Sequence, residues 1–124
     1  MNKEEEVRRA FIDRLVEEWG FPRSLISIEK KVGRLRRRYD ALVFKRGREG
    51  LIPLLLIECK AVSLKREMFD QLTGYNVTIG APFVALCNGQ EIWLGRKGES
   101  GYHAQRGLKP YQELVSDSNR AENL

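Results

Sequence analysis

The segment LIPLLLIEC, residues 51–59, limits the possible folds of this chain more than any other stretch. It contains the longest apolar run, which is far too short for a transmembrane helix of about 20 residues, so no membrane partner is expected. Because apolar residues follow one another without alternation, the segment predicts a strand buried on both faces at the centre of a sheet. Pro53 lacks a backbone donor and is expected near the start of that strand or at a bulge.

The flanking sequence supplies the helices and strands that such a sheet requires. Val7, Phe11, Leu15 and Trp19 recur at helical spacing, with Asn2 as the expected N-cap of a capping box. A second helix is expected from Ser63 as its N-cap to the stop at Gly80. Further strands are expected at residues 25–32, 39–45, 82–87 and 91–94, the last two joined by a hairpin at Asn88-Gly89.

These elements predict an α/β fold in which a central mixed sheet is flanked by helices in the order αβββαβ. We expect one domain over residues 1–112 and a polar, frayed C-terminal tail over residues 113–124.

The charge balance favours an anionic partner. The formal net charge is +5 and the pI is about 9.4, which puts nucleic acid first among candidates. The alternative is that a modest positive charge only keeps the protein soluble. Cys59 and Cys87 lie in apolar runs outside any CxxC motif, which argues against structural zinc. Two buried thiols and a charged N-terminus without a signal peptide indicate a cytoplasmic location.

The residues best suited to chemistry are Asp40, Glu58 and Lys60. Alternate residues of a strand share a face, so Glu58 and Lys60 should project together while Cys59 points into the core. Antiparallel pairing across the RGREG turn at residues 46–50 would bring Asp40 beside Glu58. Two adjacent carboxylates repel each other unless a cation lies between them.

The oxygen ligands that Mg²⁺ prefers are available here from Asp40, Glu58 and the backbone carbonyl of Cys59. Lys60 would orient the attacking water or neutralise charge in the transition state. The alternative is that Asp40 and Glu58 are strand-end charges paired with Arg38 and Lys60. The buried character of the strand that ends at Glu58 favours the metal site, because an unpaired buried carboxylate is costly.

Five stretches of the chain resemble a known family: EEEVRRAFIDRLVEEWGFP, RRRYDALVF, LLLIECKA, FDQLTGYN and APFVALCNG. In this order they resemble the N-terminal nuclease domain of type I restriction enzyme R subunits, a PD-(D/E)XK family. Tyr39 stands where the superfamily name has proline. The resemblance implies a restriction-endonuclease-like core and a Mg²⁺- or Mn²⁺-dependent DNA endonuclease acting in restriction-modification.

The resemblance implies further catalytic residues. A glutamate of the first helix would complete the site, and Glu5 is the match, with Glu4 as the adjacent alternative. Glu5 also fits the capping box, so both roles stay open. Gln71 and Tyr75 match a glutamine and a tyrosine of the second helix. For Gln71 the alternative is simple solvent exposure, and Tyr75 fits the core better than the site.

A basic segment leads directly into Asp40. Its residues would follow a phosphate backbone, although a solvated loop is the alternative; they are Lys31, Arg34, Arg36, Arg37 and Arg38. No GxxxxGK[ST] loop is present, so no ATP site is expected. His103, the one histidine, lies in a weakly patterned region.

Two activities therefore remain open. A DNA endonuclease of this size would act as a homodimer to cut both strands. A catalytically silent domain of the same fold would bind nucleic acid or protein without cutting.

Overall fold

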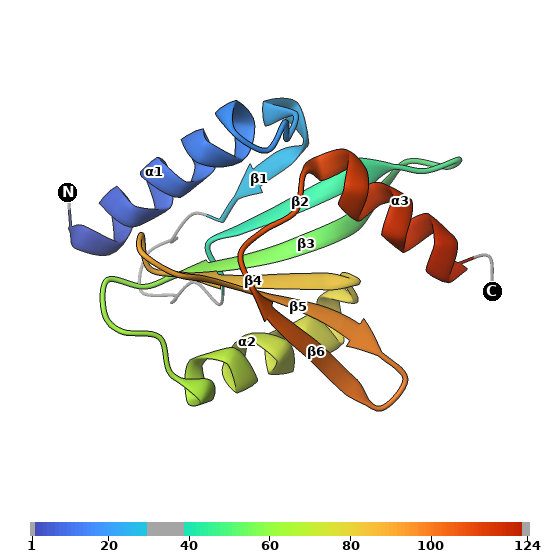
Figure 1. Cartoon of the computed structure of the whole chain (residues 1–124). Helices are drawn as coiled ribbons and strands as arrows, with labels where there is room; N and C mark the ends of the chain where they lie inside the picture. Colours follow the sequence, from blue (N-terminus) through green and yellow to red (C-terminus); the bar gives the residue numbers. More distant parts are fainter. Residues whose placement is uncertain (1, 30–38, 123–124) are drawn as a thin grey trace.

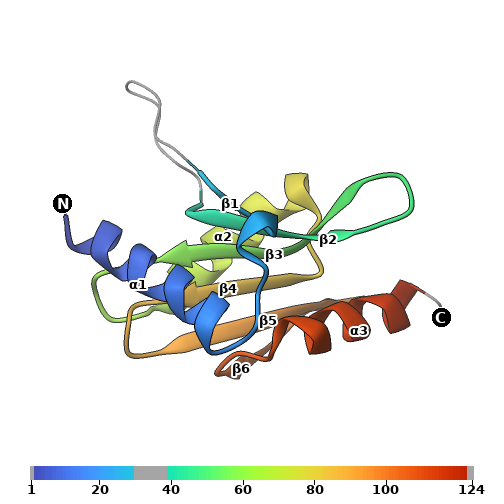
Figure 2. The same ribbon diagram turned by 90° about the horizontal axis from the view of Figure 1, so that it is seen from above.

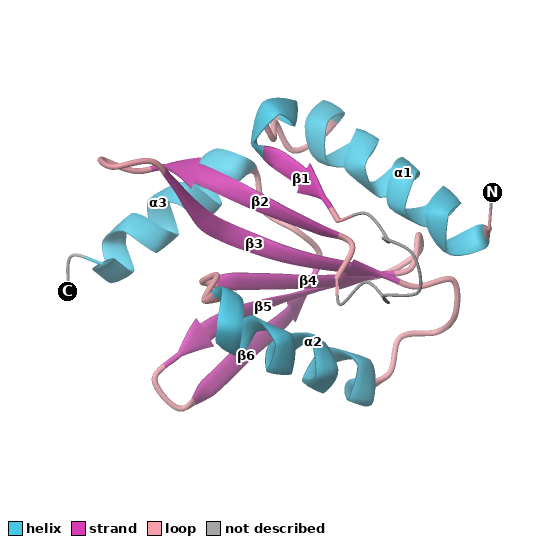
Figure 3. Cartoon of the chain, turned by 180° about the vertical axis from the view of Figure 1, so that it is seen from behind, coloured by secondary structure: helices cyan, strands magenta, loops and turns pink. Residues whose placement is uncertain are grey.

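The computed structural model describes residues 2–29 and 39–122 and has an α/β fold. A six-stranded sheet lies between helices α1 and α3 on one face and helix α2 on the other (Figures 1 and 3). The elements in chain order are α1 (Lys3–Glu17), the short 3-10 helix η1 (Arg23–Leu25), β1 (Ile26–Ile28), β2 (Ala41–Arg46), β3 (Leu51–Cys59), α2 (Arg66–Ile79), β4 (Phe83–Cys87), β5 (Ile92–Gly98), β6 (Gly101–Arg106) and α3 (Tyr111–Glu122).

The sheet is mixed, as the sequence predicted. Its strands follow chain order from β1 to β6, and every neighbouring pair is antiparallel except β3 and β4. That pair is parallel because α2 carries the chain back across the sheet between the two strands. The αβββαβ order is therefore present and is extended by β5, β6 and α3.

Strand β3 is the buried central strand that its composition predicted. Residues 54–57 have no solvent exposure. Phe44 of β2 pairs with Pro53, whereas the preceding Val43 pairs with Leu55. Leu54 is therefore the extra residue of a β-bulge, and the expectation that Pro53 lies beside such an irregularity is confirmed.

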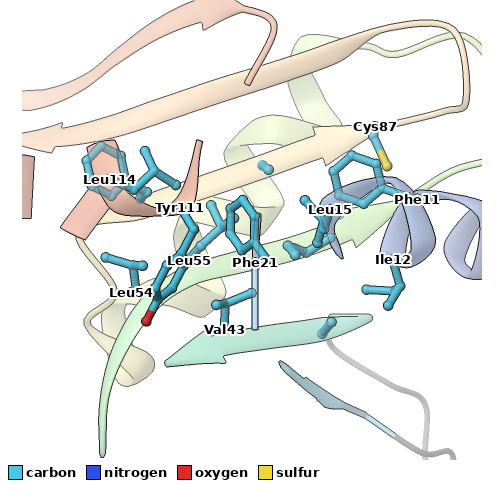
Figure 4. Close-up of a cluster of buried hydrophobic side chains, with 14 of the residues drawn as sticks. Phe11, Ile12, Leu15, Phe21, Val43, Leu54, Leu55, Cys87, Tyr111 and Leu114 are labelled. Atoms are coloured by element: carbon cyan, nitrogen blue, oxygen red, sulfur yellow. The ribbon is translucent and has the colours of Figure 1, made fainter. Parts of the chain in front are cut away.

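Two cores hold the helices to the sheet. The larger core joins α1, η1 and α3 to one face (Figure 4), and Figure 2 shows α1 and α3 following one another along that face. Phe21 and Tyr111 meet edge to face in it, with ring centroids 5.3 Å apart. The smaller core joins Leu72 of α2 to the opposite face. Among the described residues, no helix is both long and apolar enough to cross a bilayer.

The helix boundaries partly follow the sequence signals. Asn2 caps α1 by accepting the Glu5 N–H at 2.8 Å, and Gly80 ends α2 in the left-handed conformation. The prediction that Ser63 caps the second helix is wrong, because α2 begins at Arg66 after Lys65. The Lys60 N–H donates to the Cys87 carbonyl at 2.8 Å, so the chain leaves the sheet only after residue 60. Residues 61–65 then form the connection between the sheet and α2.

The prediction of a frayed polar tail over residues 113–124 is wrong for the described part of that segment. Helix α3 packs on the sheet through fully buried Leu114, and the Tyr111 hydroxyl donates to the Phe44 carbonyl at 3.1 Å. Lys45 of β2 donates from Nζ to Ser118 Oγ and Asn119 Oδ1, each at 2.9 Å. These contacts fix a helix whose few apolar residues give little signal in the sequence.

Removing the buried side chain of α3 should destabilise the whole domain. We expect Leu114→Ala to lower the free energy of unfolding by about 2–5 kcal/mol, because it leaves a cavity between α3 and the sheet. Urea denaturation followed by circular dichroism measures this loss. Gln112→Ala, at an exposed position of the same helix, is the control and should change stability little. Equal stability of the two variants would contradict the packing of α3.

Candidate active site

Asp40 and Glu58 meet at the end of the sheet where β3 ends. Asp40 immediately precedes Ala41, whose partner in register is Ile57, so Asp40 lies beside Glu58. The first turn of α1 begins beside this same end of the sheet (Figure 1). The two carboxyl groups share a side-chain hydrogen bond. Folding thus brings together two acids that are well separated in the sequence.

Asp40 is held firmly in this position. Its side chain is buried, with 1% exposure, and its Oδ2 accepts the Cys59 N–H at 2.7 Å. Its own N–H donates to the Ile57 carbonyl at 2.8 Å, and its carbonyl accepts the Glu29 N–H at 2.9 Å. The backbone of β3 therefore sets both the place and the orientation of the Asp40 carboxylate.

Glu58 is protonated at neutral pH in this arrangement. Burial, the hydrogen bond with Asp40 and the charge of Asp40 raise the pKa of Glu58 to about 9. Lys60 acts in the opposite direction and lowers the pKa, whereas the charge of Glu4 raises it slightly further. The pair consequently holds a proton that a bound cation would displace.

The two cysteine side chains lie in the larger core and not with the carboxyl groups. Cys59 Sγ is 3.2 Å from Cys87 Sγ on the adjacent strand, and both residues are fully buried. The hydrogen bond with Cys87 and burial raise the pKa of the Cys59 thiol far above its usual range. Cys59 therefore offers the site its backbone carbonyl and not a thiolate.

Helix α1 contributes two residues to this end of the sheet. Glu4 is the acid of the first turn whose charge acts on Glu58, and Arg8 Nη1 lies 3.7 Å from Asp40 Oδ1. No sequence motif had indicated a role for Arg8. Both residues continue the buried face of α1 toward its N-terminus, at helical spacing from Ile12 and Leu15. Charged residues at positions of an apolar face were the signal that could have identified them.

Glu5 and Gln71, the other residues predicted to be catalytic, belong to α1 and α2. Glu5 takes part in the helix cap, with its carboxylate accepting from Asn2 Nδ2 at 3.4 Å. Gln71 is exposed on α2, and Tyr75 packs against the core between α2 and the sheet. The predicted DNA-contacting residues Lys31, Arg34, Arg36, Arg37 and Arg38 lie outside the described residues.

The donor set at this end of the sheet fits a divalent cation. Two adjacent carboxyl groups and the Cys59 carbonyl are hard oxygen donors, and Mg²⁺ commonly uses one or two carboxylates and retains several waters. Within residues 2–29 and 39–122, no three His, Cys, Asp or Glu side chains form a complete cage. The residues fit a partly hydrated ion better than a fully protein-ligated one.

Residues 3–106 match a family model described as the type I restriction enzyme R protein N terminus (HSDR_N). The chain belongs to this family. The matched region of the HSDR_N chain runs from α1 to β6, so it includes Asp40, Glu58 and Lys60 and leaves α3 outside. Comparisons with curated proteins and with solved structures found no match.

Proposed function

We propose that this HSDR_N chain is a PD-(D/E)XK nuclease that hydrolyses phosphodiester bonds of DNA with Mg²⁺ or Mn²⁺. The observation that carries the proposal is the pair of carboxyl groups formed by buried Asp40 and half-buried Glu58, which share a proton beside Lys60. An acid pair of this kind is costly to bury, and perturbed carboxyls of this kind are concentrated at functional sites. The family match adds the relation to a restriction enzyme.

The roles follow from the position of each group. Asp40, Glu58 and the Cys59 carbonyl would hold the ion, which supplies Lewis-acid chemistry and lowers the pKa of water. Glu58 serves as a ligand only after losing the proton it shares with Asp40. The Lys60 ammonium, close enough to influence Glu58, would donate to a phosphate oxygen and offset the negative charge of the transition state.

The supporting residues of the proposal are revised by these positions. Glu5 and its alternative Glu4 both remain predicted acids of α1, and the charge of Glu4 on Glu58 favours Glu4 while Glu5 takes part in the cap. Gln71 and the basic residues 31–38 remain predicted contacts to DNA. A homodimer that cuts both strands and a cytoplasmic location also remain predictions.

Divalent-ion binding by calorimetry tests the proposal directly. We expect saturable Mn²⁺ binding near pH 7.5 with a heat that depends on the ionisation enthalpy of the buffer, since Glu58 releases its proton on binding. Glu58→Gln should weaken binding by at least about tenfold, because it removes a charged ligand.

The matched control is Glu67→Gln, an exposed acid in the first turn of α2. It should bind Mn²⁺ as the unaltered chain does. The proposal would be contradicted if Glu58→Gln bound Mn²⁺ with the affinity of the unaltered chain, or if the unaltered chain showed no saturable Mn²⁺ binding. DNA binding that does not depend on metal and is not followed by strand cleavage would instead indicate the catalytically silent binding domain.

A further inference from the structure

The Asp40 carboxylate is held between two elements, one acting on each oxygen. Oδ2 accepts the Cys59 N–H of β3 at 2.7 Å. Oδ1 lies 3.7 Å from Arg8 Nη1 of α1, within ion-pair range. A backbone donor on one side and a guanidinium on the other therefore fix both the orientation and the charge environment of Asp40.

Arg8 is a permanent cation at this site. Its side chain is only 15% exposed, and its Nε and Nη1 are buried without a hydrogen-bond partner in the described part of the chain. A guanidinium does not lose its proton in proteins, so its burial must be offset by nearby negative charge. Asp40 supplies that charge directly, and Glu4 lies one helical turn before Arg8.

This arrangement restricts how Asp40 can bind cations. In two-metal sites the ions lie about 3.5–4 Å apart, so a shared carboxylate commonly directs one oxygen to each. Here one oxygen of Asp40 already accepts an N–H and the other faces a guanidinium. A second divalent ion on the Arg8 side would meet a fixed positive charge at short range, and this repulsion is strong at a buried site.

We propose that Arg8 is a positioning residue that fixes Asp40 and limits the site to a single divalent cation. The inference rests on the proposed function, because it assumes that Asp40 and Glu58 bind metal. Arg8 thereby takes the place that a second ion would occupy. Its charge also remains at the site when no metal is bound, so Asp40 keeps its orientation before the ion arrives.

Counting bound Mn²⁺ by electron paramagnetic resonance tests this inference. The free-ion signal in a titration gives the number of ions bound per chain without any need for activity. We expect one ion for the unaltered chain and two for Arg8→Gln, at a Mn²⁺ concentration that saturates both. Arg8→Lys keeps the charge and should bind one. Arg14→Gln, on the same helix and paired with Glu18 away from the site, is the control and should also bind one.

The outcomes separate this inference from the proposed function. Two ions bound by the unaltered chain, or a folded Arg8→Gln variant that binds one ion or none, overturns the role of Arg8 and leaves the nuclease proposal standing. No ion bound by the unaltered chain overturns both. Circular dichroism checks folding, and if Arg8→Gln does not fold, the counts for the unaltered chain and for Arg8→Lys still decide, since two ions in either overturn the inference.

Discussion

Replacing Lys60 with Ala should lower Mg²⁺-dependent DNA cleavage by about 10²–10³-fold, the loss typical for one group that stabilises transition-state charge. The fold should persist, because the bond from Lys60 to the Cys87 carbonyl uses the backbone N–H and the side chain is only half-buried. Mn²⁺ binding should persist as well, since Lys60 is not a ligand. Single-turnover cleavage of plasmid DNA at saturating Mg²⁺ measures the effect.

The control for Lys60→Ala is Lys65→Ala, which removes an exposed lysine just before α2 that makes no side-chain cap. Its cleavage rate should match that of the unaltered chain. Undiminished cleavage by Lys60→Ala would remove this residue from the mechanism. Asp40→Ala is a poorer test, because it leaves Arg8 and the Cys59 N–H without their partner. Breaking a buried ion pair lowers the free energy of unfolding by about 3–5 kcal/mol, so a loss of cleavage could come from unfolding.

The stability of the metal-free protein should fall as pH rises from 5 to 9. The pKa of Glu58 is about 9 in the folded chain, against an ordinary value of 4.5 for a glutamate. Between these values the unfolded state loses the proton and the folded state keeps it, so each rise in pH favours unfolding. The stabilisation is complete below the lower value and is lost as pH passes through the upper one. We expect Tm in EDTA to fall by about 5–10 °C over this range.

Glu58→Gln isolates this effect from the titration of other groups. The amide stays neutral and can still donate to Asp40, so the fall due to Glu58 should disappear and the variant should be the more stable protein near pH 9. Added Mg²⁺ should stabilise the unaltered chain at this pH more than the variant. Thermal denaturation measures both. Parallel pH curves for the two proteins would show that Glu58 has no raised pKa.

Local sequence signals predicted the elements that depend on nearby residues. Asn2 caps α1 through Glu5, and the apolar run of residues 51–59 is the central strand with a bulge beside Pro53. The segment of α3 escaped prediction, because its helix depends on contacts with distant residues such as Lys45 and Phe44. Ser63 was a misleading cap signal, because a connection from the sheet to the helix layer occupies that segment.

The residues of the candidate site also include some that the sequence predicts and some that only the structure identifies. Asp40, Glu58 and Lys60 could be selected from residue type and strand spacing, because alternation determines which side chains share a face. The choice between Glu5 and its alternative Glu4 shows the limit of this reasoning. Both acids lie in the first turn of α1, and only the placement of the helix on the sheet decides which one acts on Glu58.

The sequence by itself determined a sheet buried on both faces, the strands that carry the acids, and the presence of a lysine beside them. Periodicity and composition depend on residues close in the sequence, so they predict these features without a structure. Only the tertiary structure decided that α3 closes the core, that Arg8 lies against Asp40, and that Glu58 retains a proton. Those outcomes depend on burial and on distances between residues remote in the chain, which the pairing of β2 with β3 and the packing of α1 and α3 on the sheet establish.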